Sequence, residues 1–156
     1  MPASRPRALH VVWYGGLAAG ALDILNATDF WRLYNGADPT LILQAIAAGL
    51  LGKEAFAGGA GTAARGLMLH FGIALGMAAV FWLACRRFPS MLARPVISGV
   101  AYGLLTWLAM NYVVVPLSRA TPPPFIPAWF IDGLLAHILL VSLLLAFLAR
   151  WSARRA

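Results

Sequence analysis

Residues 126–149 read IPAWFIDGLLAHILLVSLLLAFLA, a run in which only Asp132 and His137 have ionisable side chains. An α-helix rises 1.5 Å per residue, so roughly 20 residues cross a bilayer core of about 30 Å. Three further apolar runs of similar length are Leu9–Asn26, Thr62–Cys85 and Pro95–Leu117. Four such runs in 156 residues predict an all-α integral membrane protein with four transmembrane helices.

Composition supports a membrane protein and argues against a nucleic-acid-binding one. Hydrophobic residues make up 62% of the chain and charged residues 11%, against roughly 25% in soluble domains. The net charge of +7 does not form a basic face, because the basic residues stand at the ends of the apolar runs. We therefore expect residues 1–156 to form a single membrane domain whose main partner is the lipid bilayer.

The basic residues predict the topology through the excess of Lys and Arg in cytoplasmic loops. With the N-terminus inside, the cytoplasmic side carries Arg5, Arg7, Arg86, Arg87, Arg94, Arg150, Arg154 and Arg155. The outer side then carries Arg32, Lys53, Arg65 and Arg119. This division predicts a multi-pass protein with both termini in the cytoplasm. The first run also resembles a signal peptide, but it continues as an apolar helix to Leu25, so we interpret it as a retained span.

The segment between the first two runs predicts a helix that does not cross the membrane. Asp38 and Pro39 have the pattern of an N-cap followed by proline at the first helical position, and the helix then extends to Phe56. If this helix crossed, Arg86 and Arg87 would lie outside. We therefore expect residues 39–56 to form a short interfacial or re-entrant helix in the first outer loop.

Pairs of glycines four residues apart occur in three of the four predicted spans. Such pairs allow two helix backbones to approach closely within lipid. The pairs are Gly16 and Gly20, Gly72 and Gly76, and Gly99 and Gly103. They favour an up-down bundle of four helices in which each pair packs against a neighbouring helix.

Polar side chains within the predicted spans are the candidate functional residues. They are Asp23, His70, Asn111, Asp132 and His137, with Asn26 one turn from Asp23 and Thr106 near Asn111. At about 1.5 Å per residue, all five fall in the outer half of the bilayer, roughly 5–17 Å deep. Because polar groups facing hydrocarbon are costly, we expect these five to line one pocket open to the outer side.

Several functions fit such a pocket, and the residues leave them open. Asp23 and Asp132 suit a cation or proton site in a transport-related protein, with the histidines as titrating partners. His70 and His137 suit the axial ligands of haem b in a redox protein, or two ligands of a metal site completed by carboxylates. The five side chains also suit hydrogen bonds between helices in a purely structural protein.

No enzyme motif accompanies these residues, so we expect neither catalytic residues nor, outside the haem alternative, a cofactor. The favoured interpretation is a small transport-related protein or an accessory subunit. An accessory subunit would dock on a larger membrane complex or form a homo-oligomer.

Several stretches of the chain resemble a group of uncharacterised bacterial inner-membrane proteins of about this length. They are residues 15–24 (GGLAAGALDI), 43–46 (LQAI), 49–52 (GLLG), 69–71 (LHF) and 110–118 (MNYVVVPLS). The resemblance extends over nearly the whole chain. It implies a four-helix protein of the bacterial inner membrane and implies no activity, substrate or catalytic residue.

Overall fold

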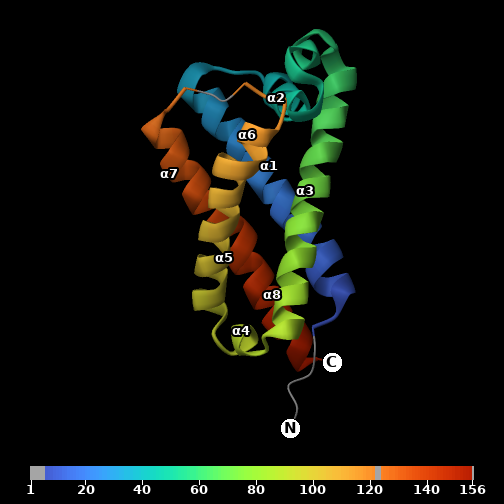
Figure 1. Cartoon of the computed structure of the whole chain (residues 1–156), viewed down its shortest axis with the longest axis vertical. Coiled ribbons are helices and arrows are strands. Elements are labelled where there is room, and N and C mark those ends of the chain that lie inside the picture. Colours follow the sequence, from blue (N-terminus) through green and yellow to red (C-terminus); the bar gives the residue numbers. More distant parts are fainter. Residues whose placement is uncertain (1–5, 122–123, 156) are drawn as a thin grey trace.

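A computed structural model describes residues 6–121 and 124–155 of the chain. All regular elements in these two ranges are helices, and no strand occurs among them. Four long helical rods form a bundle, and a shorter helix lies at one end of it (Figure 1). The predicted all-α membrane fold is confirmed.

Each rod is built from one or more helical elements. The first rod joins the π-helical η1 (Leu9–Gly15) to α1 (Gly16–Asn35), and the second is α3 (Gly59–Arg87). The third rod comprises α5 (Pro95–Ala109), the π-helical η3 (Met110–Val114) and α6 (Val115–Leu117). The fourth comprises α7 (Pro127–Ala136), the π-helical η4 (His137–Ser142) and α8 (Leu143–Arg154). The remaining elements are α2 (Pro39–Leu51), the 3-10 helix η2 (Gly52–Ala57) and the single turn α4 (Ser90–Ala93).

Successive rods run in opposite directions, so both described ends of the chain meet at one end of the bundle (Figure 1). The backbone N–H of Arg7 donates to Ser152 Oγ at 2.9 Å, and Trp82 Nε1 donates to the Pro6 carbonyl at 2.9 Å. We call this the basic end, because it holds Arg7, Arg86, Arg87, Arg94, Arg150, Arg154 and Arg155. Arg5, predicted on the same side, lies outside the described residues.

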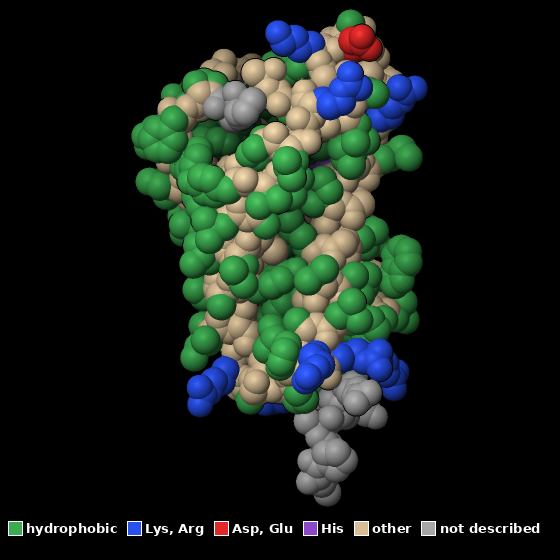
Figure 2. All heavy atoms as spheres, viewed as in Figure 1, with side chains coloured by type: hydrophobic (Ala, Val, Ile, Leu, Met, Phe, Trp, Pro, Cys, Tyr) green, Lys and Arg blue, Asp and Glu red, His purple; other side chains and the backbone are tan. Residues whose placement is uncertain are grey.

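Charged side chains gather at the two ends of the molecule and leave an apolar middle (Figure 2). The opposite end, which we call the α2 end, carries Arg32, Lys53, Arg65 and Arg119 together with Asp29, Asp38 and Glu54. This arrangement of two charged ends around a hydrophobic band is the one that a membrane-spanning bundle requires.

Four helices in the described part of the chain are long and apolar enough to cross a membrane. They are Pro39–Ala57, Gly59–Arg87, Pro95–Leu117 and Pro127–Arg154. The last three contain or match predicted spans, but the first rod is not in this set and α2 with η2 takes its place. His10, Asp23 and Asn26 lower the hydropathy of the first rod, although it runs the length of the bundle (Figure 1).

The α2 helix starts and ends at the same end of the bundle and lies across it (Figure 1). As the sequence predicts, Asp38 caps it by accepting from the Thr40 backbone N–H at 2.7 Å. Hydrogen bonds from the Thr40 side chain and from this backbone N–H lower the pKa of Asp38. Gln44 Nε2 donates to the Gly59 carbonyl at 3.1 Å. The Arg119 N–H donates to the Gly49 carbonyl at 2.9 Å. These bonds fasten α2 to the start of α3 and to the loop after α6.

Two of the three glycine pairs pack as predicted. A Cβ atom added at Gly16 would lie 3.0 Å from Leu75 Cδ2, and one at Gly20 would lie 2.9 Å from Phe71 Cδ1, so both glycines bring α1 against α3. A Cβ atom at Gly103 would lie 2.7 Å from Ile138 Cα in η4. Gly99 similarly approaches α8.

The third pair does not pack, and here the prediction is wrong. Gly72 and Gly76 are exposed, and a Cβ atom at either would have no heavy atom within 4 Å. The face of α3 that packs on α1 carries Phe71, Ala74 and Ala78 instead. Because α3 is apolar all round, hydropathy alone does not distinguish its packed face from its outward face.

Candidate functional site

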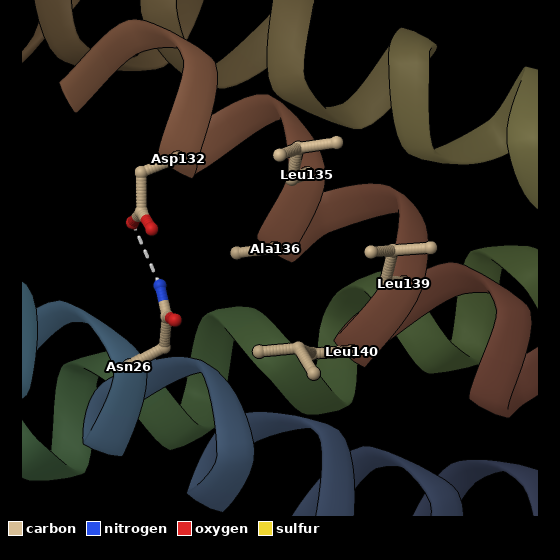
Figure 3. A pocket seen from close by; sticks show the side chains of 6 residues that line it. All are labelled: Asn26, Asp132, Leu135, Ala136, Leu139 and Leu140. Carbon is tan, nitrogen blue, oxygen red and sulfur yellow. Dashed lines mark hydrogen bonds between the residues drawn. The ribbon is translucent and has the colours of Figure 1, made fainter. Parts of the chain in front are cut away.

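Asp132 forms a direct polar contact between two rods. It lies on α7, and Asn26 on α1 donates from Nδ2 to Asp132 Oδ2 at 2.7 Å. Both side chains are half-buried. Figure 3 shows them pointing toward each other across the space between the two helices. A charge-assisted hydrogen bond of this length is a strong one in a region of low dielectric constant.

A cavity of about 120 Å³ opens beside this pair (Figure 3). Its lining residues are Asn26, Asp132, Leu135, Ala136, Leu139 and Leu140. We call it the Asn26–Asp132 pocket. The pocket is polar where the two side chains meet and apolar along the helix that follows Asp132. It therefore has the lining expected for a ligand with one polar group and a short hydrocarbon part.

Two oxygen atoms of the pocket remain available as acceptors, and the Asn26 amide keeps its second N–H as a donor. Asn26 uses its amide nitrogen on Asp132 Oδ2, and no other side-chain hydrogen bond reaches Asp132 in the described parts of the chain. Asp132 Oδ1 and Asn26 Oδ1 are left to accept hydrogen bonds. The pocket can thus bind a group that donates hydrogen bonds, and the carboxylate favours one that carries positive charge.

His70 lies elsewhere, in the contact between α3 and α1. Its Nε2 atom is 2.8 Å from the Gly20 carbonyl oxygen, and its ring meets Phe71 edge to face at 5.6 Å. A carbonyl oxygen only accepts, so Nε2 carries the proton and donates. The His70 side chain therefore links α3 to α1 by a hydrogen bond at the Gly20 contact.

The other predicted residues bond within their own helices or have no such contact. His137 Nδ1 is 2.9 Å from the Gly133 carbonyl oxygen, and Asn111 Nδ2 donates to the Trp107 carbonyl at 2.9 Å. Asp23 is half-buried, and no side-chain hydrogen bond to it is seen in residues 6–121 and 124–155. None of Asp23, His70, Asn111 and His137 lines the Asn26–Asp132 pocket. The structure thus joins Asp132 to Asn26 rather than to the other four.

The metal alternative needs several ligating side chains in one place, and the haem alternative needs two suitably placed histidines. No three His, Cys, Asp or Glu side chains in the described ranges come together to hold a metal ion. Two axial histidines would each have to point a free ring nitrogen at one iron. His70 uses Nε2 in its hydrogen bond to Gly20, whereas His137 bonds to Gly133 through Nδ1 and leaves Nε2 available.

A second polar cluster, which the sequence did not indicate, lies at the basic end. Ser152 is fully buried and lies 2.9 Å from His10 Nδ1 as well as from the Arg7 backbone nitrogen. The His10 ring packs 5.2 Å from the Trp151 ring. His10 is the second residue of the first apolar run, and Ser152 lies three residues beyond the last run. The available signal was therefore a polar residue near each outer end of the chain. The cluster fastens the first rod to the fourth.

Comparison of the chain with known protein families, curated proteins and solved structures found no match. The geometry of the Asn26–Asp132 pocket is therefore the main guide to function.

Proposed function

We propose that this chain is a transport-related protein of the bacterial inner membrane that binds a small amphiphile in the Asn26–Asp132 pocket. One observation carries the proposal. Two polar side chains from different rods meet at 2.7 Å beside a cavity whose other walls are leucine and alanine. A positively charged, hydrogen-bond-donating group fits the carboxylate, and a hydrocarbon chain fits the walls.

The charges at the two ends of the bundle support a pocket that opens toward the outer side of the membrane. The basic end carries seven described arginines and no acidic residue, whereas the α2 end mixes both signs. Because cytoplasmic segments of membrane proteins carry an excess of Arg and Lys, this charge distribution supports a cytoplasmic basic end. Asp132 is near the start of α7, close to the α2 end, so the proposed pocket takes ligand from the outer half of the bilayer.

The cost of a carboxylate in the membrane also favours a ligand. Ionised groups within a span are expensive and are usually paired or functional. Asn26 supplies one donor to Asp132 but no positive charge. An ammonium group in the pocket would complete the hydrogen bonding of the carboxylate and neutralise it.

Binding of n-octylammonium to the protein in phosphatidylcholine nanodiscs tests this proposal. We expect the compound to raise the midpoint of thermal unfolding, because a ligand at 100 times its Kd stabilises the folded state by about 2.7 kcal/mol. In Asp132→Asn the rise should be largely lost, since the amide keeps the shape but not the charge. Circular dichroism at increasing concentrations of the compound measures the midpoint.

Asp29→Asn is the matched control, because Asp29 is an exposed aspartate on α1 toward the same end. It should respond to n-octylammonium as the wild type does, and 1-octanol should give little rise in any variant. Equal rises in Asp132→Asn and wild type would contradict the proposal. So would the absence of a rise in the wild type.

An accessory subunit is the second candidate function. Gly72 and Gly76 face outward with no heavy atom within 4 Å of an added Cβ, so another helix can approach α3 closely there. Failure of n-octylammonium to bind the wild type would favour this function, in a larger complex or a homo-oligomer.

A further inference from the structure

An open apolar groove runs along α8, on the face of the helix that points away from the bundle. It has a volume of about 360 Å³ and is lined by Leu144, Phe147, Leu148 and Trp151. These positions are three or four residues apart, so they form one face of α8. They extend over roughly 10 Å of the helix and end in the tryptophan nearest the basic end.

A positively charged group lies at the end of this groove. The guanidinium carbon of Arg155 is 4.6 Å from the centre of the Trp151 ring, a cation–π contact that holds the charge beside the groove. None of the acidic residues of the sequence lies at the basic end; they are Asp23, Asp29, Asp38, Glu54 and Asp132. In residues 6–121 and 124–155, no Asp or Glu side chain at this end competes for the donors of the guanidinium.

We propose that this groove binds an anionic phospholipid, with an acyl chain along α8 and the phosphate on Arg155. A guanidinium forms paired hydrogen bonds with phosphate oxygens, and tryptophan is suited to the boundary between acyl chains and headgroups. The charge at the basic end selects an anionic lipid over a zwitterionic one. The apolar groove selects a lipid over a soluble phosphate.

The site is separate from the Asn26–Asp132 pocket, so the two proposals stand or fall independently. The groove belongs to α8 near the basic end, and the pocket belongs to α1, α7 and η4 nearer the α2 end. No residue lines both cavities. The lipid is expected to anchor the cytoplasmic end of the fourth rod.

Native mass spectrometry of the full chain in detergent tests the site with dioleoylphosphatidylglycerol and dioleoylphosphatidylcholine. We expect the wild type to bind the anionic lipid roughly tenfold more tightly, as one charge-assisted contact allows. Arg155→Gln should remove this preference, and Arg155→Lys should retain part of it. Phe147→Gln should weaken binding of both lipids, because Phe147 is half exposed and lines the groove.

Arg94→Gln is the control for general charge, since Arg94 is an exposed arginine at the same end. It should leave both affinities within about twofold, and sn-glycerol 3-phosphate should not displace the lipid. An unchanged preference in Arg155→Gln would overturn the proposal, as would an equal loss in Arg94→Gln. Unchanged binding in Phe147→Gln would show that the groove does not hold the acyl chain, and displacement by glycerol phosphate would indicate a phosphate site instead.

Discussion

Replacing Gly66 with leucine should separate α2 from α3 and strongly destabilise the protein. A Cβ atom at Gly66 would overlap the Leu43 carbonyl oxygen and would lie 2.8 Å from its carbonyl carbon and 3.2 Å from the Ala47 nitrogen. These are backbone atoms of a helix, so relief of the overlap requires α2 to move as a whole. The hydrogen bonds of Gln44 to Gly59 and Thr62 would be lost with that movement.

Overpacking of a close contact costs about 1–3 kcal/mol or more. We therefore expect the midpoint of thermal unfolding in detergent to fall by several degrees, as followed by circular dichroism. Gly61→Leu on the same helix is the control, since a Cβ atom there has no heavy atom within 4 Å. An equal stability of Gly66→Leu and Gly61→Leu would show that α2 is not docked on α3 at this point.

The second large effect is expected for Gly103→Leu. A Cβ atom at Gly103 would lie 2.7 Å from Ile138 Cα and 2.9 Å from the His137 carbonyl oxygen, both backbone atoms of η4. The third and fourth rods would have to separate along their contact. The resulting loss of stability should be comparable to that of Gly66→Leu and should appear as a lower unfolding midpoint or aggregation during purification.

Gly72→Leu provides the matched comparison, because Gly72 is also a glycine of a four-residue pair but faces outward. Its unfolding midpoint should stay the same or rise slightly, since leucine has a higher helix propensity than glycine. A loss of stability in Gly72→Leu equal to that in Gly103→Leu would mean that this face of α3 is packed. The observed rotation of α3 would then be wrong.

The sequence predicts the helices well, because their signals are local. The lengths of the apolar runs predict the rods, and Asp38 followed by Pro39 predicts where α2 begins. The expectation that α2 does not cross came from the basic residues, because a crossing α2 would put Arg86 and Arg87 on the outer side. In the structure, Thr62 at the start of α3 accepts from Gln44 of α2 and donates to the Ala55 carbonyl at 2.6 Å.

The candidate site was predicted less well, because depth along a helix does not determine direction around it. Asp132 was expected in this band, and it meets Asn26, which was expected one turn from Asp23. Asn111 and His137 were assigned similar surroundings. Each bonds instead to the carbonyl four residues earlier in its own rod, at Trp107 and Gly133.

Polar residues at similar depths need not meet in one cavity, because backbone carbonyls can accept their hydrogen bonds. A polar side chain within a span can bond to the carbonyl four residues earlier, as Thr106 does with Tyr102 at 3.0 Å. The cost of an unpaired polar group in hydrocarbon means that each such side chain needs a hydrogen-bond partner. That partner need not be another of the five side chains.

The proposed topology, with the Asn26–Asp132 pocket toward the outer face, is tested most directly by labelling single cysteines on either side of α2. Asn35→Cys and Ala60→Cys introduce exposed thiols at the end of α1 and the start of α3. The native Cys85 is buried and serves as the unlabelled background. A membrane-impermeant maleimide applied to the outer face of the inner membrane should label both positions. Labelling of the two positions from opposite sides would show that α2 crosses the bilayer and would contradict the four-rod topology.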